Sequence, residues 1–237
     1  MKSRESREKV KLPFTLEFAL VPTVVNVGSL MERGNLQHLL KQTQRLWVQW
    51  SMFDALYEQE TNYPIFERTG FKFWGELKAL LLDSIMLGIS RLLDPAANSH
   101  QENLSLRGFL VLTTDNATRQ LREADIKAMD NLWKPGIKVW RDKIISHGDL
   151  EYVAERQILP DVPIADIKKL VEMIKNFVSQ FTLEDQGFEV DFDAPVTHWV
   201  PTVLSYLSRG IEKKDEELSD LRAQIGPDFD PDVPSNE

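Results

Sequence analysis

Three residues near the middle of the chain have the types and spacing for phosphodiester chemistry. They are Arg141, Asp142 and His147, in the segment WRDKIISHGD of residues 140–149. A guanidinium holds a phosphate group with its planar fork of donors. A histidine moves a proton to or from a ribose hydroxyl near neutral pH. An arginine and a histidine on one helix can therefore cleave a ribose-phosphate bond without a metal ion.

The predicted helix over residues 136–147 places Arg141 in its apolar stripe. At about 100° per residue, Ile137, Ile144 and Ile145 fall within about 60° of Arg141, and His147 falls at the edge of the stripe. An always-charged guanidinium on a buried face needs a partner or a ligand. The helix wheel therefore singles out Arg141 as either a ligand-binding or a paired residue.

The structural alternative for each residue stays open on pattern alone. Arg141 can be a core arginine paired with Glu76, Asp83 or Asp94 of the preceding long helix, because buried charges are usually paired. His147 can be a C-terminal cap that the helix dipole favours. Capping and catalysis by His147 are compatible. We interpret Arg91 as the helix-end ion-pair partner of Asp94.

Metal and thiol chemistry are not expected. The chain has no cysteine, which excludes disulfides, cysteine-ligated metals and thiol nucleophiles. No two of the four histidines lie three to five residues apart, so there is no local histidine clamp. No phosphate-binding glycine loop or hydrolase elbow is present. We expect no metal and no cofactor.

The charge is acidic and uneven along the chain. The formal net charge is −9, of which residues 212–237 contribute −6 and the remainder −3. This balance argues against broad, sequence-independent nucleic-acid binding, but it leaves room for a small basic site. The most apolar run, residues 77–93, contains Lys78, Asp83 and Arg91, which a bilayer centre tolerates poorly. We expect a soluble, cytoplasmic protein with no membrane contact.

Hydrophobic periodicity predicts an all-α helical bundle. The strongest element is residues 71–94, which are apolar around nearly the whole circumference, as in a helix that is central to its fold or covered by a partner. Asn35 is the predicted cap of the first helix, Pro64 and Gly70 mark the connection that follows it, and Gly88 allows a close helix approach. The predicted helices are 36–60, 71–94, 104–112, 118–133, 136–147, 164–181 and 198–210, the last continuing towards residue 223.

The chain is expected to have three parts. Residues 1–30 form a charged tail and an extended arm or short hairpin, residues 31–211 the helical domain, and residues 212–237 a charged helix extension and a disordered acidic tail. Residues 186–195 can be a short strand or a loop. The aromatic side chains of residues 47–57 are expected in the core rather than as a base-stacking platform.

The segment WRDKIISHGD resembles the motif of the HEPN superfamily, namely arginine, a polar residue, a four-residue stretch and histidine. The flanking residues are similar to the abortive-infection AbiU-like branch in particular, which has lysine, a small residue and aspartate where this chain has Lys143, Ser146 and Asp149. The preceding helix, which ends in SRLLD at residues 90–94, also resembles that branch. The likeness covers roughly residues 36–182.

The resemblance implies an HEPN-like homodimer in which two motifs face each other. It implies a metal-independent endoribonuclease that leaves 2′,3′-cyclic phosphate ends, acts on RNA as a toxin in antiviral defence, and can have an antitoxin protein as a partner. On this interpretation His147 is the general base or acid and Arg141 holds the scissile phosphate. Asp142 orients the pair or supports the dimer, and Lys143 adds attraction for phosphate.

Two other functions remain open at this stage. The first is a catalytically silent dimer of the same fold that binds RNA, a nucleotide or a protein partner, which the acidic charge favours. The second is a purely structural protein in which Arg141 is sealed in the monomer core with a carboxylate. The exposure of Arg141 and the identity of its partner distinguish these functions.

Overall fold

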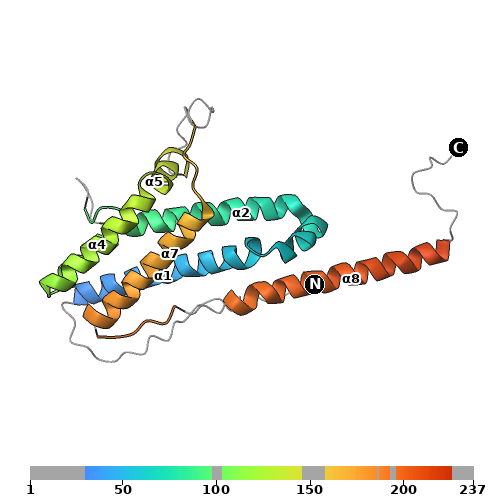
Figure 1. The fold of residues 1–237 in the computed structure, drawn as a ribbon. Helices are drawn as coiled ribbons and strands as arrows, with labels where there is room; N and C mark the ends of the chain where they lie inside the picture. Colours follow the sequence, from blue (N-terminus) through green and yellow to red (C-terminus); the bar gives the residue numbers. More distant parts are fainter. Residues whose placement is uncertain (1–29, 98–102, 146–157, 186, 193–195, 226–237) are drawn as a thin grey trace, which may run out of the picture.

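The computed structural model describes residues 30–97, 103–145, 158–185, 187–192 and 196–225 (Figure 1). Every regular element in these ranges is helical, which confirms the all-α prediction. Our predictions for residues 1–29 and 226–237 lie outside the described residues. So does the prediction for His147.

Two long helices form the centre of the bundle. Helix α1 (Leu30–Tyr57) is followed by the short turn η1 (Glu60–Asn62) and by α2 (Tyr63–Leu93), which runs back along it (Figure 1). The amide of Asn62 donates hydrogen bonds to the carbonyls of Ala55 and Leu56, both at 2.9 Å, and so satisfies the end of α1. The predicted cap at Asn35 is wrong, because good helix formers upstream carry α1 back to Leu30.

Gly70 interrupts α2 rather than separating two helices. Pro64 lies in the first turn of α2, and Gly70 has φ 126° and ψ 76°, so the helix kinks there. The predicted connection at Pro64 and Gly70 is therefore a helix start followed by a kink. A left-handed φ suits glycine, because a Cβ atom clashes with the backbone there.

We expect Gly70→Ala to lower the free energy of unfolding by about 1–2 kcal/mol, the cost of a left-handed alanine. Gly75→Ala is the matched control, since a Cβ at Gly75 meets nothing within 4 Å and alanine is the better helix former by up to about 1 kcal/mol. Urea unfolding of both variants measures the difference. Equal effects at the two glycines would contradict the kink's role.

The core between α1 and α2 depends on a close helix contact. A Cβ built on Gly88 would lie 3.2 Å from Cδ1 of Leu46, which confirms the predicted close approach. The aromatic residues Trp50, Phe53 and Tyr57 of α1 are buried. They are core residues, as predicted, and are not available to stack on bases.

Shorter helices cover this pair. They are α3 (Leu106–Phe109), η2 (Leu110–Leu112), α4 (Asn116–Trp133), α5 (Ile137–Trp140), the π turn η3 (Arg141–Ile145), α7 (Ile164–Gln180) and the π turn η4 (Phe181–Asp185). Helices α4 and α7 contact each other and lie across α1 and α2 (Figure 1). The predicted apolar stripe of α7 is buried from Ile167 to Val178. Residues 187–192 have no regular structure, so this described part of the predicted strand or loop is a loop.

The last helix, α8 (Val196–Ile225), continues through the charged run as predicted. Val200 and Leu204 are buried against the bundle, whereas the residues from Glu212 to Gln224 are exposed and extend beyond it (Figure 1). Arg68 of α2 forms a two-point ion pair with Asp215, at 2.5 Å on both sides. Within the described residues, no helix combines the length and the hydropathy needed to cross a membrane.

Candidate functional site

The end of the central helix positions the motif arginine. Helix α2 ends at Leu93, and the backbone N–H of Asp94 donates to the carbonyl of Ser90 at 2.8 Å before Pro95 stops the helix. The Asp94 carboxylate accepts hydrogen bonds from Nη1 and Nη2 of Arg141, both at 2.9 Å. Of the three carboxylates predicted as partners of Arg141, the structure selects Asp94.

Arg141 is neither sealed nor fully open. Its side chain is 19% exposed, as is that of Asp94. The wheel correctly predicted an inward-facing guanidinium, but the buried-core alternative required complete sealing. The bidentate geometry fixes the plane of the guanidinium, and the side chain as a whole stays partly exposed.

Two further charges complete a network at the motif. Nε of Arg141 lies 2.6 Å from Oδ1 of Asp142, an ion-pair contact without hydrogen-bond geometry. The other carboxylate oxygen of Asp142 accepts from the ammonium of Lys138, four residues earlier. The charges of the two cations and the two carboxylates therefore cancel. An incoming phosphate has to compete with Asp94 for the two terminal nitrogens of Arg141.

The turn that carries the motif is a π turn and not the regular α-helix that we predicted over residues 136–147. Helix α5 is α-helical up to Trp140, and η3 (Arg141–Ile145) is π-helical. The indole of Trp140 donates to the carbonyl of Pro160 at 2.8 Å, and Ile137 is fully buried. Single π turns inside helices are frequent at functional sites.

The structure brings together only part of the predicted site. Arg141 and Asp142 are in contact, and Lys143 lies half-buried in the same turn. His147, Ser146 and Asp149 lie outside the described residues, so the separation of Arg141 from His147 stays a prediction.

Sequence reasoning missed one site residue and misassigned another. Lys138 was overlooked, although its spacing of four from Asp142 is the signal for a helical ion pair. The predicted ion pair of Arg91 with Asp94 is wrong, because Asp94 pairs with Arg141 and Arg91 is exposed. The side chain of an aspartate one residue beyond a helix can contact either the last turn of that helix or the element that packs next to it.

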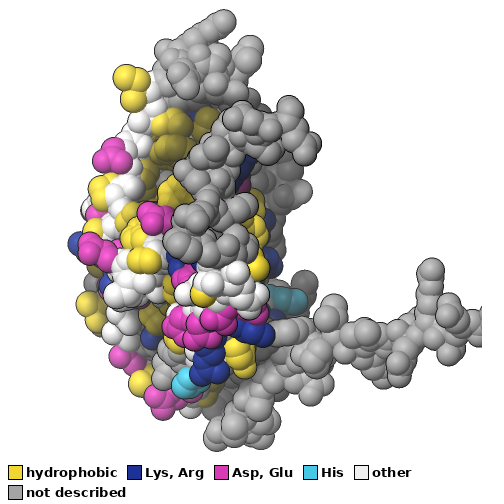
Figure 2. Space-filling model, turned by 90° about the vertical axis from the view of Figure 1, so that its right-hand side faces the viewer, with side chains coloured by type: hydrophobic (Ala, Val, Ile, Leu, Met, Phe, Trp, Pro, Cys, Tyr) yellow, Lys and Arg dark blue, Asp and Glu magenta, His cyan; other side chains and the backbone are white. Residues whose placement is uncertain are grey.

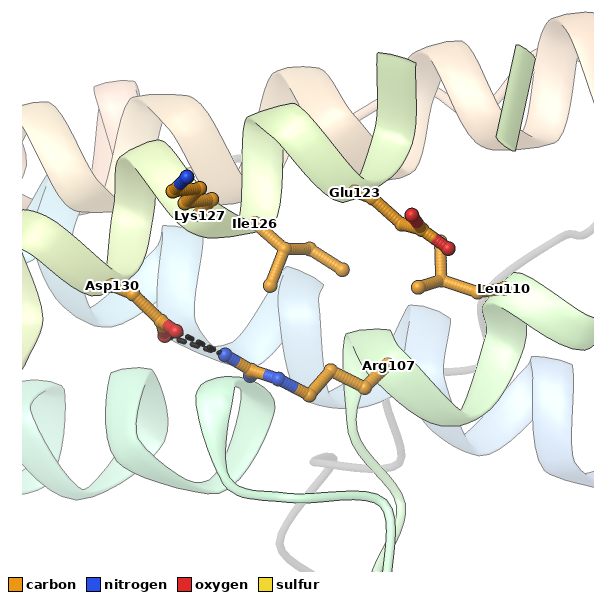
Figure 3. A pocket seen from close by; sticks show the side chains of 6 residues that line it. All are labelled: Arg107, Leu110, Glu123, Ile126, Lys127 and Asp130. Atoms are coloured by element: carbon orange, nitrogen blue, oxygen red, sulfur yellow. Dashed lines mark hydrogen bonds and ion pairs between the residues drawn. The ribbon is translucent and has the colours of Figure 1, made fainter. Parts of the chain in front are cut away.

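A second arginine also binds the end of α2. Nη1 of Arg107 donates to the carbonyl of Leu93 at 2.5 Å, and its Nη2 donates to both oxygens of Asp130 at 2.6 Å. Figure 3 shows this pair across a surface pocket of about 280 Å³, with Glu123 near Leu110 at the other end. Both terminal nitrogens of Arg107 donate to protein groups, so a ligand in this pocket has to compete with Asp130 for this guanidinium.

The charges around Asp130 predict a pH dependence of stability. Burial by itself raises the pKa of Asp130, but the hydrogen bonds and charges of Arg107 and Lys134 outweigh it and lower the pKa below 3.8. The ionised carboxylate therefore stabilises the fold above pH 3.8, and this contribution is lost as the pH falls through the lowered pKa.

We expect Asp130→Asn to reduce the free energy of unfolding by about 1.5–3 kcal/mol near neutral pH, the value of charged hydrogen bonds. The difference from wild type should shrink as the pH falls from neutral through the lowered pKa of Asp130, because the protonated carboxyl is then uncharged like the amide. Chemical unfolding across this range measures it. A difference that does not change with pH would contradict the assignment.

In the described ranges, no three or more histidine, aspartate or glutamate side chains gather as a metal site requires.

The all-helical bundle, with Arg141 of the motif bound to Asp94 at the end of its central helix, has the fold class that the HEPN resemblance implies. The family model for AbiU2 (HEPN_AbiU2) matches residues 34–192, about two thirds of the chain. The chain therefore belongs to this HEPN family of abortive-infection proteins. Comparison with curated proteins and with solved structures returned no match.

Proposed function

We propose that this protein is a metal-independent endoribonuclease with a composite site of Arg141 and His147 at a homodimer contact. The observation that carries the proposal is the guanidinium of Arg141, which Asp94 orients in a bidentate pair while the side chain stays partly open to solvent. Membership of the AbiU2 family supports the same assignment.

The proposed reaction needs only side chains of this chain. His147 takes the proton of the ribose 2′-hydroxyl, and the 2′-oxygen attacks the adjacent phosphorus. The bond from phosphorus to the 5′-oxygen breaks, and that oxygen takes up a proton from a histidine in its imidazolium form. Arg141 holds the non-bridging oxygens as charge grows on them. The products are a 2′,3′-cyclic phosphate and a 5′-hydroxyl.

The neighbouring residues have supporting roles in this proposal. Asp142 contacts Nε of Arg141 and so limits its rotation, and Lys143 adds positive charge in the same turn. A second copy of the chain would bring a second motif to the same cleft. Toxin-like action in antiviral defence, with an antitoxin protein as a partner, fits an RNase of an abortive-infection family.

The experiment is cleavage of single-stranded RNA by the full-length protein in the presence of a metal chelator. We expect cleavage that the chelator does not reduce, with 2′,3′-cyclic phosphate ends on the products. Absence of turnover at every enzyme concentration, or loss of turnover on chelation, would reject the proposal.

A catalytically silent dimer that binds RNA, a nucleotide or a protein is the second candidate. It is favoured by the neutral network at the motif, where Asp94 and Asp142 already face the guanidinium. The face in Figure 2 also shows acidic and basic side chains interspersed, with no gathered basic patch over its described part. Saturable binding of RNA without cleavage would favour this candidate.

A further inference from the structure

The central helix has an apolar row that the described part of the bundle leaves uncovered. Phe73 and Leu80 are 62% and 65% exposed, and Leu87 is half-buried. Residues seven apart on an α-helix differ by only about 20° in direction, so these three side chains form one line along α2. The row ends at Asp94, beside the motif arginine. We call it the α2 row.

Acidic side chains accompany the α2 row. Glu76 and Asp83 lie between its apolar residues, and neither forms an ion pair or hydrogen bond with another described residue. Burial raises the pKa of Asp83. A surface of this kind fits an occupant that has a line of apolar side chains and a net positive charge.

One segment of this chain has such a line of apolar side chains and is preceded by an excess of basic residues, while residues 10–20 themselves carry one basic and one acidic residue, Lys11 and Glu17. From residue 10 to residue 20 every second residue is a large apolar one, namely Val10, Leu12, Phe14, Leu16, Phe18 and Leu20. Strict alternation puts all six on one face of an extended segment. Residues 1–11 contain five basic and two acidic residues. These residues lie outside the described part of the chain.

The length of the extended segment also agrees with the length of the α2 row. Ten residues of extended chain span about 33 Å, and α2 rises by about 31 Å from Phe73 to Asp94. Because Leu46 is level with Gly88, the start of α1 at Leu30 lies about 15 Å beyond Asp94. The nine residues 21–29 reach up to about 30 Å, which is enough to bring Leu20 back to Asp94.

We propose that residues 10–20 dock on the α2 row of the same chain as an extended arm, with Leu20 near Asp94 and the basic residues 9 and 11 near Glu76. A second copy of α2 is a poorer occupant, because it would set Glu76 and Asp83 against the same acidic residues.

Single cysteines test this directly, because the natural chain has none. Leu80→Cys and Leu121→Cys are matched positions on two helices, with side chains 65% and 66% exposed in the described structure. We expect a maleimide to label Leu80→Cys at least about tenfold more slowly, as a docked state favoured by about 1.4 kcal/mol requires. Equal labelling rates in two folded variants would overturn the proposal.

The arm is tested in the same Leu80→Cys background. Phe14→Asp with Phe18→Asp should raise the labelling rate to that of Leu121→Cys, whereas Thr15→Asp with Ala19→Asp, on the other face, should leave the protection in place. Protection that survives the first pair would overturn the proposal. Protection that disappears on dilution would identify a second copy as the occupant and would equally overturn it. None of these readouts depends on ribonuclease activity.

Discussion

We expect His147→Ala to slow RNA cleavage by about 10²–10⁴-fold, the usual contribution of general acid–base catalysis. The expected result follows from the proposed reaction, in which His147 removes the 2′-hydroxyl proton and no metal ion takes over that task. The measurement is the single-turnover rate on one RNA substrate, with the product ends analysed for cyclic phosphate.

The control for this variant is a histidine outside the motif. His198 lies in the first turn of α8 and is exposed, so His198→Ala should cleave at the wild-type rate. Thermal unfolding confirms that both variants are folded. Cleavage by folded His147→Ala at the wild-type rate would remove the catalytic role of the histidine.

Arg141→Lys should have the second-largest effect, a loss of about 10²–10³-fold in cleavage, as for removal of one oriented donor to a developing oxyanion. Lysine keeps the charge but lacks the planar fork that binds two phosphate oxygens. It also breaks the bidentate pair with Asp94, so the free energy of unfolding should fall by about 1.5–3 kcal/mol.

Asp94→Asn separates the two roles of this pair. It breaks the same charged contact and should lower stability by a similar amount, but it leaves the guanidinium free to hold phosphate. Cleavage by Asp94→Asn should therefore fall much less than cleavage by Arg141→Lys. Equal losses in the two variants would mean that Arg141 acts on cleavage only through the fold.

The elements of the bundle were largely predictable because their apolar side chains repeat at the helical period. The buried stripe of α7 follows from this period, and the close contact at Gly88 follows from the absence of a side chain on glycine. The ends of the helices and the kink in α2 were harder to predict. Asn35 is a good cap by residue type, yet helix formers before it extend α1, and the kink at the left-handed Gly70 lets α2 begin at Tyr63, eight residues before the predicted start at residue 71.

The candidate site was predictable in part. The place of Arg141 in an apolar stripe implied either a partner or a ligand, and the structure shows a partner, Asp94, which was one of three candidate carboxylates. The choice among the three carboxylates depends on how the helices pack against one another. The residues next to Arg141 in the sequence do not determine that packing. The π turn was not predictable from a fixed angle per residue, and the exposed α2 row was hidden by an apolar pattern that looked fully buried.

The π turn at Arg141–Ile145 has a consequence for how the motif can vary among related chains. A π turn closes its hydrogen bond over one more residue than an α turn, so it holds an inserted residue without redirecting the chain that leaves it. A homologue that lacks this residue could form a regular α turn at the arginine. The number of residues that follow the arginine can therefore differ by one between such chains.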